Sequence, residues 1–278
     1  MFAERVSLLF TDIGSLLSKY GRIYLNGIGS TLLLAVIATL LGCVIGFLCG
    51  ILQTIPCSAG DPWPKRFILK LIRGIIRVYV ELFRGTPMIL QAVFIYYGVP
   101  YFFGYGFTSI WGVSIIVVSV NTGAYMAESV RGGIMSIDRG QTEGAMAIGM
   151  NHFQTMLYVI LPQTLRNIMP QIGNNYIINV KDTSVMFIIG FAEFFSVHKM
   201  VSGAVFKYFP SATIEMAGYL TMTLLASFLL RWAERKLAGP ENFELLSADQ
   251  LVMTAGTYNS PAKGSPFDED KGENGGKL

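Results

Sequence analysis

Long apolar stretches alternate with more polar stretches along most of the chain. Five of the apolar stretches come close to the ~20 residues that an α-helix needs to cross a lipid bilayer. They cover residues 27–51, 86–103, 110–129, 169–189 and 212–230. The fourth stretch is interrupted by polar residues, namely Asn174, Asn175, Asn179 and Lys181. This pattern predicts an all-α integral membrane protein with about five transmembrane helices.

A segment just before the second apolar stretch has a different pattern. Its basic residues recur at helical spacing, at Arg66, Lys70, Arg73, Arg77 and Arg84. Its apolar residues occupy other positions, at Phe67, Leu71, Ile75, Val78 and Leu82. Amphipathic helices of this kind are typical of the membrane interface. We therefore expect an interfacial helix that leads into the second transmembrane helix.

A polar segment separates the third and fourth apolar stretches, and residues 138–162 are named the 138–162 loop. Asp138 followed by Gln141, and Asn151 followed by Gln154, both resemble capping boxes at the start of a helix. Gly149 suits the left-handed backbone conformation that ends a helix. The loop is therefore predicted to form two short helices with a sharp turn between them.

The 138–162 loop is also expected to expose an apolar face, although its sequence is otherwise polar. This face would carry Met146, Ile148, Met150, His152 and Phe153. An apolar patch on an aqueous loop is typical of a docking site for another protein. Pro162 lacks an amide donor, so we expect it where the fourth transmembrane helix begins.

The composition supports the membrane assignment and argues against a soluble domain or a nucleic-acid-binding protein. Apolar residues make up 52% of the chain and charged residues only 14%, whereas soluble domains average roughly 25% charged residues. The net charge is +3, but no basic stripe is interleaved with aromatic residues that would stack on bases. The basic excess therefore indicates cytoplasmic loops and not a nucleic-acid partner.

The charges of the connections predict the orientation of the helices. Residues 53–85 carry six Lys and Arg, whereas residues 99–109 carry no charge. Positively charged connections tend to remain in the cytoplasm. Successive connections lie on opposite sides of the membrane, so a cytoplasmic 53–85 connection places the 138–162 loop and the C-terminus in the cytoplasm as well. The same alternation leaves the N-terminus outside.

Three parts are expected along the chain. Residues 1–26 form an extracytoplasmic N-terminal segment, residues 27–236 form the transmembrane domain, and residues 237–278 form a cytoplasmic tail. The tail carries three Lys against seven Asp and Glu, and its end is rich in Gly, Ser and Pro. Such a composition buries too little apolar surface to offset the entropy of ordering. We expect disorder from about residue 255.

The 138–162 loop resembles the EAA loop of ABC importer permeases. The family pattern is Glu, Ala, Ala, three residues, Gly, nine residues, Ile or Val, one residue, Leu and Pro. The corresponding residues of this chain include Glu143, Gly144, Ala145, Gly149, Leu161 and Pro162. Gly144 departs from the pattern, because it replaces an Ala and lowers helix propensity by roughly 1 kcal/mol. The departure implies slightly looser coupling to a docked partner.

Three further stretches are similar to the polar amino-acid subfamily of these permeases. Residues 81–98 match one signature and contain Arg84, Gly85, Thr86 and Pro87. Residues 124–133 match a second signature and contain Tyr125 and Glu128. The third signature is matched by Asn174, Asn175, Lys181, Asp182, Thr183 and Ser184. The resemblance extends over about residues 27–236 and leaves out the tail.

The resemblance implies the type I ABC importer permease fold, in a bacterial inner membrane, with the 138–162 loop as a cytoplasmic coupling helix. Such a permease forms the pathway for ATP-driven, binding-protein-dependent import of a polar amino acid. Its partners would be two ABC ATPase subunits, an extracytoplasmic substrate-binding protein, and a second permease subunit, identical or homologous. The chain lacks the pattern Gly, four residues, Gly, Lys, Ser or Thr that cradles nucleotide phosphates. We therefore expect no enzymatic activity and no cofactor on this chain, with ATP and Mg bound by the ATPase.

Six polar residues on the membrane helices are candidates for the substrate pathway, because unpaired polar groups in a membrane are costly. They are Tyr125, Glu128, Asn174, Asn175, Lys181 and Asp182. Hydrogen bonds between helices explain the first four equally well, and ion pairs with Glu193 or Lys199 would explain the last two. Lipid phosphates are the favoured partners of Arg73, Arg77 and Arg84. No catalytic or metal-binding residue is predicted.

Two alternative functions remain open from the sequence. An ion-coupled secondary amino-acid transporter would need no ATPase, but such transporters usually contain an internal repeat. No repeat is evident, and five transmembrane helices do not divide into equal halves. The other alternative is an ABC permease that carries a different small solute.

Overall fold

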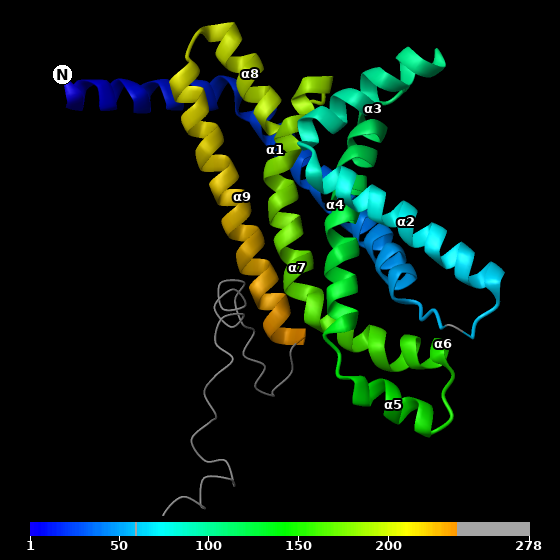
Figure 1. Ribbon diagram of the computed structural model, residues 1–278. Coiled ribbons are helices and arrows are strands. Elements are labelled where there is room, and N and C mark those ends of the chain that lie inside the picture. Colours follow the sequence, from blue (N-terminus) through cyan, green and yellow to red (C-terminus); the bar gives the residue numbers. More distant parts are fainter. Residues whose placement is uncertain (59, 238–278) are drawn as a thin grey trace, which may run out of the picture. The chain divides into compact units, whose positions relative to one another are not determined.

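The computed structural model describes residues 1–58 and 60–237, and every regular element within them is helical. The α-helices are α1 Phe2–Thr54, α2 Trp63–Gly85, α3 Met88–Phe103, α4 Ile110–Met135, α5 Arg139–Ala147, α6 His152–Thr155, α7 Leu161–Asp182, α8 Phe194–Val205 and α9 Tyr208–Leu237 (Figure 1). A π-helical turn, η1 Met156–Ile160, precedes α7, and a 3-10 segment, η2 Thr183–Ile189, follows it. The disorder expected from residue 255 lies outside the described residues.

Three helices are long and apolar enough to cross a membrane on their own, and they are α1, α4 and α9. Two bent pairs raise the number to five when each pair counts as one span. One pair is α2 with α3, and the other is the helical segment from α6 to η2 together with α8. The upper number equals the number that the apolar stretches predict, and the all-α membrane fold is confirmed.

The first helix is much longer than the apolar stretch that it contains. It runs unbroken for 53 residues, so the segment 1–26 belongs to the same helix as the stretch 27–51. No proline interrupts the sequence before Pro56, which lies two residues after the helix end. Other helices also extend past their apolar stretches, because apolar pattern marks the part that fits a bilayer and not the helix ends.

The predicted second transmembrane helix is broken rather than straight. The helix α3 has only 16 residues, and the axes of α2 and α3 differ by 112°. The break lies at Thr86 and Pro87, where Thr86 has an extended backbone with φ −122° and ψ 145°. Proline disfavours the helical conformation of the residue before it, which explains why the chain bends here.

Close packing of α1 on α4 forms the centre of the bundle. Gly42, Gly46 and Gly50 lie four residues apart on α1 and face α4 directly. A Cβ atom at Gly46 would lie 2.8 Å from the backbone carbon of Met126. The sequence pattern of three glycines therefore serves packing within this chain, as small residues do in membrane helices.

Two apolar clusters extend the core to the other helices. One joins α1, α3, α4 and η2 around Leu34, Val117 and Met186. The other joins α1, α7, α8 and α9 around Phe194 and residues of its neighbours. The helices α5 and α6 lie at one end of α4 and α7, and α8 lies at the opposite end of α7 (Figure 1).

Candidate functional site

The 138–162 loop folds into two short helices that meet at a tight turn, as the sequence predicts. Gly149 connects α5 to α6 with a backbone φ of +86°. Its amide donates to the carbonyl of Met146 at 3.0 Å, and the amide of Met150 donates to the carbonyl of Ala145 at 3.1 Å. These bonds close the end of α5 with a glycine in the left-handed region.

Both helices of the loop begin after the predicted capping residue, but only the second has the complete capping box. At α6, the Asn151 side chain accepts from the Gln154 amide, and the Gln154 side chain accepts from the Asn151 amide, both at 2.9 Å. At α5, Asp138 accepts from the Gly140 amide at 2.6 Å instead of forming a box with Gln141. The Gln141 side chain accepts from Gln163 of α7 at 3.3 Å. A capping box is therefore replaced there by a link between α5 and α7.

One face of the loop packs against the bundle. Ala145 and Thr155 are buried, which fixes both α5 and α6 to their neighbours. A cavity of about 250 Å³ lies between the loop and the ends of α1 and α4, with Thr54 and Ile134 in its wall. The loop is thus an attached part of the fold.

The opposite face of the loop is exposed and partly apolar. Ile148 is 80% exposed, Phe153 73% and Met146 49%. Met150 and His152, which were expected on the same face, are only half-exposed. The turn at Gly149 places Met150 next to α5 and removes it from the patch. Glu143 and Gly144 are exposed beside the apolar residues.

Pro162 lies in the first turn of α7, but the chain is already helical before it. The helical path runs from α6 through the π-helical turn η1 into α7 without interruption. Proline cannot donate to the carbonyl four residues back and clashes with it in a regular helix. A π-helical turn directly before the proline relieves this conflict by widening the helix. Leu161 is half-buried beside it.

Two of the candidate pathway residues meet the signature residue Arg84. Arg84 of α2 forms an ion pair with Glu128 of α4, and its guanidinium lies 5.5 Å from the centre of the Tyr125 ring. Arg131 approaches Glu128 at 3.8 Å. The structure therefore joins two stretches that are more than 40 residues apart in sequence.

The bend at Thr86 and Pro87 is held by a buried amide. The Gln91 side chain donates to the carbonyls of Phe83 and Thr86, both at 2.9 Å. Asn121 of α4 donates to the Gln91 side-chain oxygen, also at 2.9 Å. Gly85, Thr86 and Pro87 are exposed, and their backbone forms the bend between α2 and α3. The role of Asn121 was missed, although an amide inside an apolar stretch is a signal of such a bond.

The asparagines of α7 divide into exposed and buried positions. Asn174 is exposed, whereas Asn175 is buried and donates to the Gln171 carbonyl at 2.9 Å. Asn179 is buried as well, and its amide donates to the Thr39 hydroxyl at 2.8 Å. The Thr122 hydroxyl donates to the Asn179 oxygen at 3.1 Å. Asn179 therefore links α7 to both α1 and α4.

Lys181 and Asp182 do not form the ion pairs that the sequence left open. Lys181 is exposed and Asp182 is half-buried. Among the ion pairs of residues 1–58 and 60–237, none joins either residue to Glu193 or Lys199. The Glu193 carboxylate instead caps the start of α8, accepting from the Ser196 amide at 2.6 Å.

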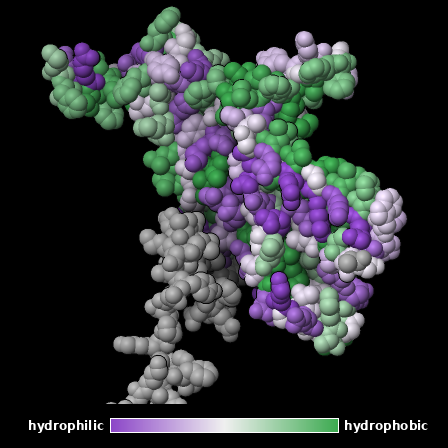
Figure 2. Space-filling view, in the orientation of Figure 1, coloured by the Kyte–Doolittle hydropathy of each residue, from purple (hydrophilic) through white to green (hydrophobic). Residues whose placement is uncertain are grey.

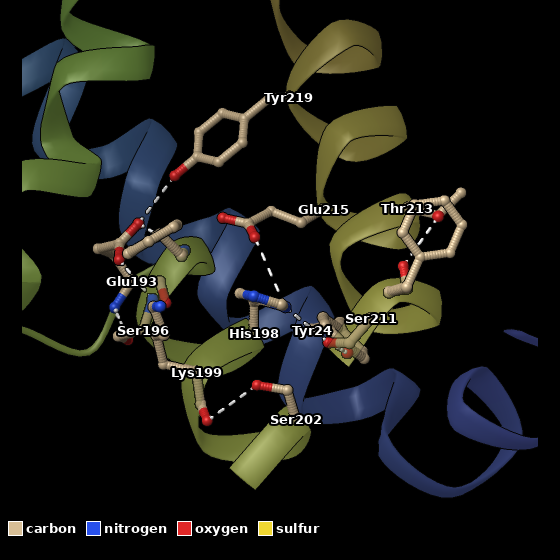
Figure 3. Close-up of polar contacts among 12 residues, drawn as sticks. Tyr24, Glu193, Ser196, His198, Lys199, Ser202, Ser211, Thr213, Glu215 and Tyr219 are labelled. Carbon is tan, nitrogen blue, oxygen red and sulfur yellow. Dashed lines mark hydrogen bonds and ion pairs between the residues drawn. The ribbon is translucent and has the colours of Figure 1, made fainter. Parts of the chain in front are cut away.

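A polar cluster between α1, α8 and α9 was not anticipated (Figure 3). His198 lies 2.9 Å from the Ser211 hydroxyl and 3.7 Å from the Glu215 carboxylate. The hydroxyls of Tyr24 and Ser211 are 2.7 Å apart, and Tyr219 donates to Glu193 at 2.9 Å. The signal that could have found it is the isolated Glu215 in the fifth apolar stretch. The remaining members come from distant parts of the chain.

Comparison with known proteins identifies the family. Residues 46–239 match the family described as "Binding-protein-dependent transport system inner membrane component". The glutamine transport system permease protein GlnP of Escherichia coli (strain K12) is 33% identical over 213 residues, which cover 77% of this chain and 92% of GlnP. The arginine transport system permease protein ArtQ of Bacillus subtilis (strain 168) is 29% identical over 213 residues, which cover 77% of this chain and 91% of ArtQ.

Solved structures agree with this assignment. A crystal structure of an amino acid ABC transporter with histidines superposes with a TM-score of 0.67 at 31% identity, covering 79% of this chain and 96% of the other. An inward-facing form of the MetNI methionine ABC transporter gives a TM-score of 0.62 at 20% identity and shows the same fold. With the helical bundle and its two-helix loop, these matches establish that this chain belongs to the family of inner-membrane components of binding-protein-dependent transport systems.

Proposed function

We propose that this chain is the permease subunit of an ABC importer for a polar amino acid and forms the translocation pathway through the membrane. The family match supports a permease, and relatives named for glutamine and arginine transport support an amino-acid substrate. The same matches favour an ABC permease over an ion-coupled secondary transporter. A second permease subunit, identical or homologous, completes the pathway.

The exposed face of the 138–162 loop is the proposed docking surface for an ABC ATPase subunit. The complex holds two such subunits, one docked on each permease half. The docking surface carries Met146, Ile148 and Phe153 beside the carboxylate of Glu143. The observation that carries this proposal is the combination of a fixed inner face and an exposed apolar outer face. An exposed apolar patch with a polar rim is typical of protein contacts. ATP and Mg bind the ATPase and not this chain.

Movement of the docked ATPase reaches the membrane helices through the loop. Because α5 follows α4 and α6 runs continuously into α7, displacement of the loop moves both α4 and α7. The hydrogen bond between Gln141 and Gln163 adds a direct link from α5 to α7. Glu143, Gly144, Ala145, Gly149, Leu161 and Pro162 are therefore assigned to coupling. Alternating access follows from the shift of α4 relative to α7.

The proposed orientation follows from the same docking. The 138–162 loop and the C-terminus face the cytoplasm, where ATP is available, and the N-terminus faces the opposite side. An extracytoplasmic substrate-binding protein delivers the amino acid from that side. The six Lys and Arg of residues 53–85, all of which lie on α2, support this orientation.

The proposed substrate pathway runs along the exposed face of α7. Asn174 and Lys181 are seven residues apart, so two helical turns place them on one face, and both are exposed in the single chain. Tyr125 and Glu128 form a second polar region beside Arg84. Asn175 and Asp182 are more enclosed, and we assign Asn175 to helix packing because its amide is bonded within the chain.

A charge on the apolar face tests the docking proposal. Replacement Ile148→Asp should leave the permease folded, because the side chain is 80% exposed, and should strongly reduce ATPase retention when the permease is purified. The matched control is Tyr105→Asp, at a position that is 65% exposed between α3 and α4. The control should retain the ATPase at the wild-type level. Equal retention by both variants would contradict docking at the loop.

A further inference from the structure

A charged cavity lies where α1, α2 and α4 approach one another, away from the 138–162 loop surface. Its volume is about 420 Å³. Six ionisable side chains line it, namely Arg73, Arg77, Glu81, Arg84, Glu128 and Arg131. Four guanidinium groups face two carboxylates, so the cavity carries a formal excess of two positive charges. Hydrophilic residues gather along α2 on the face shown in Figure 2.

The pairing of these groups leaves donors available at one end of the cavity. Glu128 is already engaged by Arg84 and approached by Arg131. Arg73 donates a hydrogen bond from one terminal nitrogen of its guanidinium to the carbonyl of Ile55. Arg77 forms no ion pair within residues 1–58 and 60–237. Arg77 is exposed and lines the cavity, so its guanidinium is available to an anion there.

The depth of the cavity in the fold suits a phosphate group. Gln53 lines the cavity one residue before α1 ends, and Arg131 lies four residues before α4 ends. Both residues also lie two positions past an apolar stretch, 27–51 or 110–129, where we expect hydrocarbon to give way to headgroups. Arg73 and Arg77 occupy one face of α2, and the exposed Leu71, Ile75 and Val78 occupy another. A helix of this kind contacts acyl chains with one face and phosphates with the other.

We propose that this cavity is a binding site for a phosphate group, held mainly by Arg73 and Arg77. Guanidinium groups bind phosphate oxygens through paired, charge-assisted hydrogen bonds, and four of them exceed the charge that two carboxylates neutralise. Glu81 lies on the same face of α2 and weakens the site by repelling the anion. The phosphate belongs either to a lipid headgroup or to a free phosphate, and both offer the same chemistry to the arginines.

The test measures binding to the full-length chain, purified in a neutral detergent, by isothermal titration calorimetry. The two probes are inorganic phosphate and dihexanoyl phosphatidylglycerol, a soluble lipid with one phosphodiester. Arg77→Gln should weaken binding at least about tenfold, since hydrogen bonds to charged groups contribute ~1.5–3 kcal/mol. Glu81→Gln should strengthen binding several-fold, because it removes the repelling charge. Lys19→Gln is the control, because Lys19 is exposed on α1 thirty-four residues before Gln53, and it should bind as the wild type does.

The two probes separate the sources of the phosphate. Tenfold tighter binding of the lipid assigns the site to a headgroup, whereas equal or tighter binding of inorganic phosphate assigns it to the free ion. The proposal is overturned if neither probe binds the wild type, if Arg77→Gln binds as well as Lys19→Gln, or if Glu81→Gln weakens binding. Transport is not measured, so failure here leaves the proposed import function untouched, and failure of import leaves this site untouched.

Discussion

At the scale of single residues, the 138–162 loop depends on one backbone conformation. Gly149 has a φ of +86°, and no atom lies within 4 Å of the place where a Cβ atom would stand. Substitution there strains the backbone without any steric clash. Gly144, five residues earlier, is equally uncrowded but lies inside α5 with an ordinary helical backbone. The two glycines therefore separate the effect of conformation from the effect of side-chain size.

We predict opposite effects at these two glycines. Gly149→Val should raise the free energy of the closed turn by about 1–2 kcal/mol, because a side chain is unfavourable in the left-handed region. ATP-driven uptake should then fall roughly tenfold while the amount of permease in the membrane stays unchanged. Gly144→Ala should stabilise α5 by about 1 kcal/mol and maintain uptake. Uptake assays on membrane vesicles check both, and full uptake by Gly149→Val would refute the importance of the turn.

Two asparagines of α7 give a second residue-scale prediction. Asn179→Ala removes bonds to Thr39 and Thr122 and should lower the free energy of unfolding by about 1–3 kcal/mol, since buried hydroxyls lose their partner. Asn174→Ala alters an exposed amide and should change stability by no more than roughly 0.5 kcal/mol. Thermal unfolding in detergent compares the two. A similar loss of stability in both variants would argue against Asn179 as a link between helices.

At the scale of helices, the contact between α1 and α4 sets the geometry of the bundle. Three glycines on α1 allow the approach, and Gly46 is the most enclosed of them because the Met126 backbone blocks its Cβ position. Gly29 lies on the same helix with open space around it. This difference shows which glycines of α1 serve packing.

The prediction at this scale is a matched pair on α1. Gly46→Ala should destabilise the chain by about 1–3 kcal/mol, because the added methyl group overpacks the contact with α4. Gly29→Ala should be neutral or stabilise by about 0.5–1 kcal/mol, because alanine favours the helix. Both are measured by thermal unfolding of the purified chain. Equal stability of the two variants would mean that α1 and α4 are less closely packed than described.

The helices also show how far sequence reasoning reaches. Apolar stretches predicted five membrane segments, which is the upper number that the described helices allow, and local chemistry predicted the turn at Gly149 and the cap at Asn151. The start of α1 at Phe2 and the 112° bend between α2 and α3 were not predicted. Helix ends outside a bilayer depend on caps and packing rather than on hydropathy. The Thr86–Pro87 pair gave a local signal for the bend, but its angle depends on Gln91 and Asn121.

At the scale of the whole molecule, the contacts between distant segments lay beyond prediction. The cluster of Figure 3 joins Tyr24 of α1 to Ser211 and Glu215 of α9 and to His198 of α8. Ser211 and Glu215 share a face of α9, but no local periodicity relates them to Tyr24 or His198, so only the packed bundle brings the three helices' residues together. The same holds for the pairing of Arg84 with Glu128. The family and the docking loop, in contrast, depend on motifs that are continuous in sequence.

The central claim is that this chain imports an amino acid only with an ATPase partner. The most direct measurement reconstitutes the chain in lipid vesicles with its ATPase, its second permease subunit and its substrate-binding protein, and follows concentrative uptake of glutamine and arginine. We predict uptake that requires ATP hydrolysis and ceases when the ATPase is left out. Concentrative uptake by the chain alone, driven by an ion gradient without any ATPase, would contradict the account.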